Sequence, residues 1–161
     1  MILSVRNAKN RKLTKLLKTA TVFFANKLMS KKLTNNICIR IVILDEVYAG
    51  AGFCLCEDSV GKQRNFLREL HRSRNKLEMI FTLAHEMVHV KQMARNELRD
   101  KSIKSRTVTT WMGQEYDDNT EYWDHPWELE AYGLERGLVA KFLLEYNKFR
   151  ELHQTKKEWF F

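Results

Sequence analysis

The chain has 161 residues, of which 44% are hydrophobic and 30% are charged, so it can bury the core of one domain and is too apolar for a disordered chain. Its single proline and six glycines exclude collagen-like chains and Pro-rich or Gly-rich linkers, and no apolar run approaches the roughly 20 residues of a membrane-spanning helix. Three cysteines cannot all pair within the chain, which favours a reducing, intracellular compartment. We therefore expect a cytoplasmic protein, in the host cytoplasm if its source is viral.

Charge is unevenly distributed around the formal net value of +8. Residues 1–44 contain ten lysines and arginines and no acidic residue, whereas residues 107–135 contain eight acidic residues and no lysine or arginine. A basic segment attracts nucleic acid or an anionic surface through a sequence-independent field. It is equally typical of the solvated face of a core helix, or of a helix that docks on the protein's own acidic segment. These interpretations of the basic segment stay open.

The first half of the chain predicts a basic helix followed by a sheet. Apolar residues at helical spacing, with lysines between them, predict an amphipathic helix over about residues 8–33. Residues 37–44 are mostly β-branched and have isoleucine at every second position at their start, which indicates a strand. Residues 51–57 and 65–71 are typical of two further strands. The simplest assembly is a small, mostly antiparallel sheet of three to four strands.

The next part of the chain predicts a buried helix and an irregular segment. Residues 75–95 contain no glycine or proline and are apolar on almost every side, so this helix should run through the core. Residues 96–122 are polar and without a clear period, except for a strand-like stretch that ends in Trp111.

A second long helix is predicted near the end of the chain. Pro126 is favoured at a first helical position, and apolar residues at helical spacing follow it from residue 127 to about residue 149. Residues 150–161 are expected to form a tail. Together these elements predict an α+β fold in a single domain over residues 1–161.

The predicted core helix contains the sequence His85-Glu86-Met87-Val88-His89, an H-E-x-x-H motif. At roughly 100° per residue, side chains four positions apart lie about 40° from each other on a helix, so both imidazoles can reach one metal ion. Glu86 lies beside this pair, where a carboxylate can take a proton from a metal-bound water. Two buried histidines that bound nothing would have to be uncharged and hydrogen-bonded, which is costly, so we expect them to bind metal.

A catalytic zinc site usually has three protein ligands, so a further donor is required. Residues 95–100 contain no histidine, and the best later segment is residues 124–135, where the second helix begins with carboxylates. Glu128 and Glu130 lie about 200° apart on a helix and cannot both face the metal. We favour Glu128, because the small Ala131 beside it allows close packing against the histidine-bearing helix.

Several residues near this segment are candidates for other roles. His125 competes as the third ligand, but a residue before proline is held extended and can instead hydrogen-bond the substrate or a metal ligand. A hydrolase also needs a donor for the oxyanion that forms on the scissile carbonyl. Tyr116, Tyr122, His125 and Tyr132 lie in suitable segments, and the sequence does not rank them.

The HEMVH motif, followed roughly forty residues later by PWELEA, resembles the small zinc metallopeptidases of the gluzincin branch, most closely the compact SprT-like peptidases carried by phages and bacteria. The resemblance covers about residues 37–146 and implies a zincin-like fold. It also implies that His85, His89 and Glu128 hold zinc and that Glu86 is the catalytic base. SprT and Spartan proteins themselves use a third histidine and often add a cysteine zinc ribbon. This chain has neither, so their DNA-linked substrates are not carried over.

The sequence therefore predicts a zinc-dependent peptidase that hydrolyses peptide bonds of a protein or peptide substrate, with a zinc-activated water and Glu86 as general base. The alternative is a nucleic-acid-binding module in which the basic N-terminal helix binds the nucleic acid and the zinc site is structural or vestigial. A third hypothesis, an interaction protein that acts through the acidic segment or the aromatic C-terminal residues, is not singled out by any feature. No particular oligomeric state is predicted.

Overall fold

The computed structural model describes residues 1–46, 52–58, 62–103, 106–116 and 120–158. Its main sheet has four strands in the order β1-β2-β4-β3. The bounds of these strands are β1 Ile2–Arg6, β2 Cys38–Leu44, β3 Gly52–Cys56 and β4 Asn65–His71. The mixed α+β class predicted from the sequence is confirmed.

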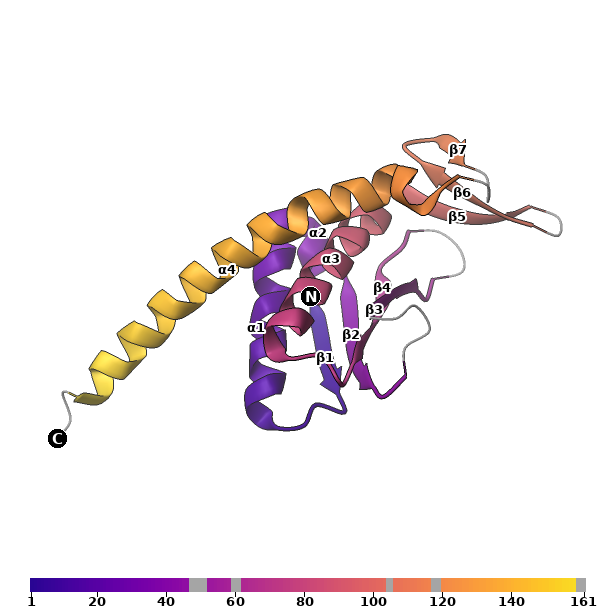
Figure 1. Ribbon diagram of the computed structural model, residues 1–161. Coiled ribbons are helices and arrows are strands. Elements are labelled where there is room, and N and C mark those ends of the chain that lie inside the picture. Colours follow the sequence, from indigo (N-terminus) through magenta and orange to yellow (C-terminus); the bar gives the residue numbers. More distant parts are fainter. Residues whose placement is uncertain (47–51, 59–61, 104–105, 117–119, 159–161) are drawn as a thin grey trace.

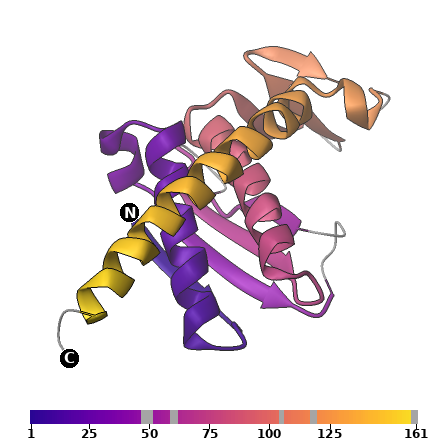
Figure 2. The same cartoon turned by 60° about the vertical axis from the view of Figure 1, so that its left-hand side comes forward.

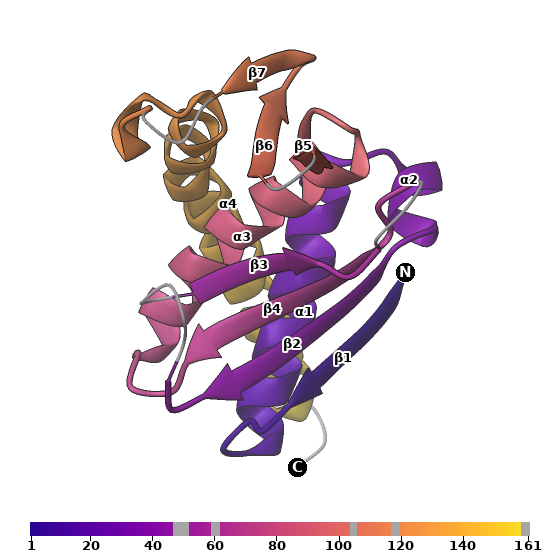
Figure 3. The same ribbon diagram turned by 90° about the vertical axis from the view of Figure 1, so that its right-hand side faces the viewer.

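Three long helices lie on one side of this sheet (Figures 1 and 3). They are α1 (Arg11–Leu28), α3 (Lys76–Ala94) and α4 (Pro126–Glu158). Helix α1 contacts β1, and α3 contacts β3 and β4, so these two helices form the layer next to the sheet. Helix α4 crosses over both of them, which Figure 2 shows, and its first turn lies near the end of α3. This crossing brings the start of α4 to the HEMVH motif.

The main sheet is mixed, and the predicted mostly antiparallel arrangement is wrong. Strand β1 pairs with β2 and β2 pairs with β4 in parallel, whereas β3 pairs with β4 antiparallel. The difference arises from connectivity, because α1 carries the chain back between β1 and β2, and the pattern within a strand does not reveal such a crossover. Strand β1 was not predicted, since its five residues are too few to show a period.

The predicted helix over residues 8–33 is confirmed in its central part and is divided near its end. Helix α1 completely buries Leu17 and Phe24 on its apolar face. A separate short helix, α2 (Lys31–Asn35), follows after a break. Ser30 starts it, because its side chain accepts a hydrogen bond from a main-chain N–H of the new first turn at 3.3 Å.

The lysines of α1 face solvent. Lys12, Lys15 and Lys18 are all exposed. Among the described residues, α1 forms an ion pair with α4 through Lys27 and Glu145 at 3.1 Å, and none with the acidic segment. This exposure agrees with a solvated helix face, and nucleic-acid binding by α1 stays a prediction.

Helix α3 is the predicted core helix, and it begins with a capping box. The Asn75 side chain accepts hydrogen bonds from the main-chain N–H groups of Leu77 and Glu78 at 2.9 and 3.0 Å. The Glu78 carboxylate in turn accepts from the Asn75 N–H at 3.0 Å. This reciprocal arrangement satisfies donors that have no partner within the helix.

Replacing Asn75 with alanine is expected to lower the free energy of unfolding by about 1 kcal/mol, because two N–H groups lose their acceptor. The replacement Asn75→Asp keeps a capping oxygen and should cost much less. Urea denaturation followed by circular dichroism measures both variants. Equal stability of the alanine variant and the parent protein would contradict the capping role.

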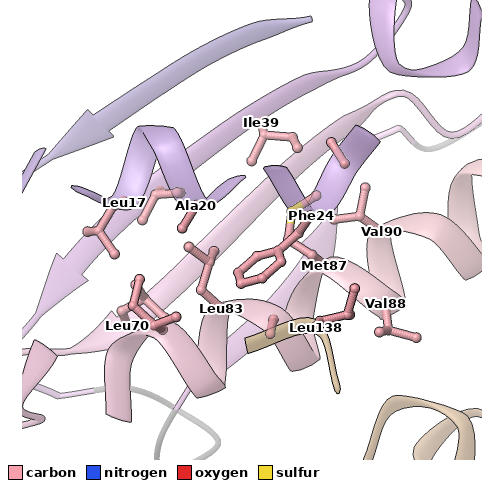
Figure 4. Packing of buried hydrophobic residues seen from close by; sticks show 14 of the residues in the cluster. Leu17, Ala20, Phe24, Ile39, Leu70, Leu83, Met87, Val88, Val90 and Leu138 are labelled. Atoms are coloured by element: carbon pink, nitrogen blue, oxygen red, sulfur yellow. The ribbon is translucent and has the colours of Figure 1, made fainter. Parts of the chain in front are cut away.

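The core lies between the sheet and the first helical layer. Leu83, Met87 and Val90 of α3 are completely buried, as is Phe24 of α1. Figure 4 shows these side chains packed together beside Leu138 of α4. Because α3 is enclosed on several sides, the polar residues Glu86 and His89 of its HEMVH motif are buried with the apolar ones.

The segment after α3 is more regular than predicted. It forms a second, antiparallel sheet in the order β5-β6-β7, at the end of the molecule where α4 begins (Figure 1). The bounds are β5 Leu98–Ile103, β6 Arg106–Trp111 and β7 Gln114–Tyr116. The strand-like stretch ending in Trp111 is confirmed within β6. The flanking strands were missed because their polar residues show no alternation.

Helix α4 begins one residue before its predicted start and extends beyond its predicted end. It is helical through Glu158, so the residues expected as a tail from residue 150 continue the helix to that residue, and residues 159–161 lie outside the described part. Residues 150–158 contain neither glycine nor proline, which explains why the helix continues. In the described part of the chain, no helix combines the length and apolar character needed to cross a lipid bilayer.

Candidate metal centre

The two histidines of the HEMVH motif lie one turn apart on α3, and their rings converge. The ring centroids of His85 and His89 are 4.8 Å apart, and their Nε2 atoms are 3.1 Å apart. Their side chains are only 12% and 9% exposed. Both imidazoles therefore converge on one point, as predicted from their spacing.

A third donor comes from the first turn of α4. The carboxylate oxygens of Glu128 lie 3.2 Å from His85 Nε2 and 3.4 Å from His89 Nε2. Ala131, on the same side of α4, is completely buried, as expected where two helices pack closely. His85, His89 and Glu128 thus form a buried group that can hold a metal ion.

The two other candidates for the third ligand have different partners. Glu130 accepts hydrogen bonds from Lys91 Nζ at 2.6 Å and from Gln92 Nε2 at 2.9 Å. The ring of His125 stacks on that of Trp127, with centroids 4.4 Å apart. Neither residue belongs to the group around the paired imidazoles.

The second ring nitrogen of each histidine faces an acceptor. His85 Nδ1 lies 3.1 Å from a carboxylate oxygen of Glu135, and His89 Nδ1 lies 2.8 Å from Gln92 Oε1. Because both partners accept, each Nδ1 carries the ring proton and each Nε2 presents a lone pair. Two lone pairs and the Glu128 carboxylate then face one another. Such a buried set of acceptors needs a cation or an added proton at its centre.

The size of the group fits a zinc ion. The two imidazole nitrogens are 3.1 Å apart, and Glu128 places one carboxylate oxygen 3.2 Å from His85 Nε2 and the other 3.4 Å from His89 Nε2. Nitrogen and oxygen ligands at roughly 2.0–2.1 Å from a tetrahedral zinc ion are about 3.3 Å apart from one another. The 3.1 Å separation of the two nitrogens is close to this value, and two imidazoles with one carboxylate match the donor set of catalytic zinc sites.

The charges around the group agree with cation binding. Burial lowers the pKa of His85, but the hydrogen bond with Glu128 and the charges of nearby glutamates outweigh it and raise that pKa above its usual value. Burial raises the pKa of Glu128, but hydrogen bonds from His85, His89 and Tyr122 outweigh it and hold that pKa far below its usual range. A proton can therefore occupy the group when no metal is bound, and a metal ion must displace it.

Glu86 is a buried carboxylate next to this group. It is 6% exposed, and its Oε2 atom has no hydrogen-bond partner in the described part of the chain. Its charge contributes to the raised pKa of His85, so it lies within electrostatic reach of the donors. An unpaired buried carboxylate oxygen costs stability, and such groups are concentrated at functional sites. Glu86 is therefore a buried carboxylate with a free acceptor near the donors.

Two of the tyrosines considered as oxyanion donors lie at the group. The Tyr122 hydroxyl donates a hydrogen bond to Glu128 at 2.8 Å. The Tyr132 ring packs edge-on against His85, with centroids 4.6 Å apart. Trp123, which is 63% exposed, packs against Tyr132 and extends these aromatic residues towards solvent. Burial, together with the bond to Glu128, raises the pKa of Tyr122, so its hydroxyl stays protonated and can donate.

The other two candidates pack elsewhere. The rings of Tyr116 and His125 both lie against Trp127, at centroid distances of 5.4 and 4.4 Å. The His125 carbonyl accepts a hydrogen bond from the main-chain N–H of Glu128 at 3.0 Å, which supports the start of α4, but in the described part of the chain neither ring contacts the three donor side chains.

Two residues of the site, Glu135 and Gln92, were not singled out from the sequence. Glu135 follows Glu128 by seven positions, so both lie on one side of α4, and Gln92 follows His89 by one turn of α3. This spacing places them near the donors, but many polar residues share it. Only the packing of α3 against α4 shows which of them reach the histidines.

Comparison of the chain with protein-family models, curated proteins and solved structures finds no match. The resemblance carried by HEMVH and PWELEA therefore stays a prediction. What this chain can do is inferred below from the geometry of its own residues.

Proposed function

We propose that this chain is a zinc-dependent peptidase with a zincin-like fold, of the SprT-like kind that its motifs resemble. His85, His89 and Glu128 would hold the zinc ion, and Glu86 would act as general base. The observation that carries the proposal is the convergence of two imidazoles and the Glu128 carboxylate in one buried group, within electrostatic reach of a buried carboxylate that has a free oxygen. The mixed sheet with helices on one side is compatible with this fold.

The chemistry follows from these residues. When bound, a zinc ion supplies a Lewis acid that polarises the scissile carbonyl and makes a water molecule acidic near neutral pH. Glu86 accepts the proton of the attacking water on its free oxygen and passes it to the leaving amine. The surrounding apolar side chains of α3 limit access of other water, which strengthens the electrostatic interactions at the site.

Tyr122 is the best-supported donor for the developing oxyanion. Its hydroxyl is protonated and already lies 2.8 Å from a carboxylate oxygen of Glu128. A small rotation of the ring would aim the same proton at a carbonyl oxygen bound beside the ligands. Tyr132, which contacts the His85 ring, is the second candidate.

A peptide is the favoured substrate because the sheet offers a free edge next to α3. Strand β3 is the last strand of the main sheet and pairs only with β4 within the described residues. Helix α3 packs against β3. An extended peptide can add to such an edge through main-chain hydrogen bonds and so be held beside the helix that carries the histidines.

The proposal is tested by metal analysis and hydrolysis together. The purified protein should contain about one zinc per chain, bind it again after chelation, and cleave an unfolded protein such as casein in a zinc-dependent way. A protein that takes up no zinc contradicts the metal site. If the protein takes up zinc but cleaves neither casein nor a mixed peptide library, the peptidase activity is contradicted and the proposed metal site is not.

Replacing Tyr122 with phenylalanine is expected to reduce kcat at least tenfold, because loss of one oxyanion donor typically costs about 10²–10³ in rate. Zinc content at saturating zinc should be unchanged, since all three proposed ligands remain, although loss of the hydrogen bond to Glu128 should weaken zinc affinity. The matched control is Tyr116→Phe, whose ring packs on Trp127 away from the donors. Steady-state kinetics on a fluorogenic peptide measures both, and equal rates for the two variants would rule out this role for Tyr122.

A further inference from the structure

Gln92 is a completely buried amide on α3 that contacts one of the proposed ligands. Its Oε1 atom lies 2.8 Å from His89 Nδ1. Its Nε2 atom donates to the main-chain oxygen of Trp127 and to a carboxylate oxygen of Glu130, both at 2.9 Å. The amide therefore links the histidine of one helix to two acceptors of another.

These partners determine which way the amide points. A main-chain oxygen and a carboxylate oxygen only accept hydrogen bonds, so the amide nitrogen must face Trp127 and Glu130. The reverse orientation would place the amide oxygen against two acceptors in a buried site, which is strongly unfavourable. The amide oxygen of Gln92 therefore faces His89, and His89 must carry its ring proton on Nδ1.

Glu130 is itself held in place. Its other carboxylate oxygen lies 2.6 Å from Lys91 Nζ, and Lys91 also pairs with Glu97 at 2.8 Å. Lys91 and Glu97 are 7% and 8% exposed, so this pair is shielded from solvent, whereas the Glu130 side chain is partly exposed. These ion pairs hold the start of α4 against the end of α3 and keep Glu130 directed at Gln92.

We propose that Gln92 is a positioning residue that holds the ring proton of His89 on Nδ1 and so keeps Nε2 available as a metal donor. Glu130 holds the amide in the orientation that this requires. The proposal rests on the proposed zinc site and gives each glutamate of PWELEA a separate role. Glu128 is a donor to the metal, and Glu130 acts through Gln92 on the ligand His89.

The first test replaces Gln92 with methionine, which has a similar shape and no acceptor for the His89 proton. Zinc affinity of the full chain, measured by competition with a chromogenic chelator, should fall about 10–100-fold, as is typical for loss of a hydrogen bond to a metal-bound histidine. In zinc-loaded protein with ¹⁵N-labelled histidine, NMR should show the Nδ1 proton of His89 in slow exchange in the parent. The same proton should exchange faster in Gln92→Met.

The second test exchanges the two groups by combining Gln92→Glu with Glu130→Gln. The new carboxylate at position 92 can accept the His89 proton, and the new amide at position 130 can donate to that carboxylate. The Trp127 main-chain oxygen loses the donor that Gln92 supplied, so this variant should be less stable than the parent. Zinc affinity of this double variant should exceed that of Gln92→Met by about tenfold. The control is Val90→Ala, which removes buried side-chain volume from the same helix two positions away and should leave zinc affinity unchanged.

The outcomes separate this role from the proposed function. If the parent binds no zinc, both the proposed metal site and the proposed role of Gln92 are wrong. If the parent binds zinc and Gln92→Met binds it equally tightly with a slowly exchanging Nδ1 proton, only the role of Gln92 is overturned. If Gln92→Met does not fold, the double variant Gln92→Glu/Glu130→Gln tests the role of Gln92 instead. Zinc affinity and Nδ1 exchange like those of the parent support the role, and a loss of both contradicts it.

Discussion

The variant Glu86→Gln should lose nearly all peptidase activity and keep its zinc. Glutamine has the same shape as glutamate but cannot accept the proton of the attacking water, and loss of a general base typically reduces the rate about 10²–10⁴-fold. The effect should fall on kcat, since Glu86 is not a proposed ligand of the metal. Metal analysis and steady-state kinetics of the same protein sample measure both properties.

The variant Glu86→Gln should also be at least as stable to heat as the parent protein. Glu86 is buried, and one of its carboxylate oxygens has no partner in the described part of the chain. Removing a buried, unpaired charge should leave the melting temperature unchanged or raise it, so lost activity cannot be attributed to unfolding. The matched control is Glu145→Gln, the same change on a half-exposed carboxylate of α4 that pairs with Lys27. A Glu86→Gln variant with parental kcat would contradict its role as base.

Zinc should stabilise the folded protein strongly, and the variant His89→Ala should lose this effect. A ligand that binds only the folded state at a thousandfold excess over its Kd adds about 4 kcal/mol to the free energy of unfolding. For a domain of this size that raises the melting temperature by on the order of 10 °C. Differential scanning calorimetry with zinc and with a chelator measures the shift in the parent and in His89→Ala.

A second histidine variant serves as the control for this experiment. His125 stacks on Trp127 and lies outside the donor group, so His125→Ala should retain the zinc-dependent shift. Loss of the shift in His125→Ala together with its retention in His89→Ala would reverse the proposed ligand assignment.

Because the pKa of His85 is raised, protons should also compete with zinc at a higher pH than at an ordinary histidine. Zinc affinity should therefore fall as the pH is lowered through that pKa.

The features that depend on helical geometry were predicted well. The convergence of His85 and His89 follows from the helical repeat alone, and the preference for Glu128 over Glu130 follows from the same repeat and from Ala131. The spacing within each helix is local in the chain, and the small Ala131 was enough to indicate which side of the second helix packs against the first. The structure has the same grouping of side chains.

The features that depend on distant parts of the chain were not predicted. The parallel pairing of β1 with β2 arises from the path of α1 between them, and β2 comes to lie parallel to β4 because the intervening β3 pairs on the other side of β4; strand patterns encode neither connection. The partners of the histidine Nδ1 atoms, Glu135 and Gln92, are determined by the way α4 crosses α3. Long-range packing thus selects, from many polar residues, the few that support the donor group.

The most direct test of the zinc site is X-ray diffraction from crystals grown with zinc, recorded on both sides of the zinc absorption edge. We expect one strong anomalous peak enclosed by His85 Nε2, His89 Nε2 and the Glu128 carboxylate, with ligand distances of about 2.0–2.2 Å. Absence of a peak at this position, or a zinc ion bound by other residues while these three remain paired with one another, would contradict the proposed metal centre and the peptidase function built on it.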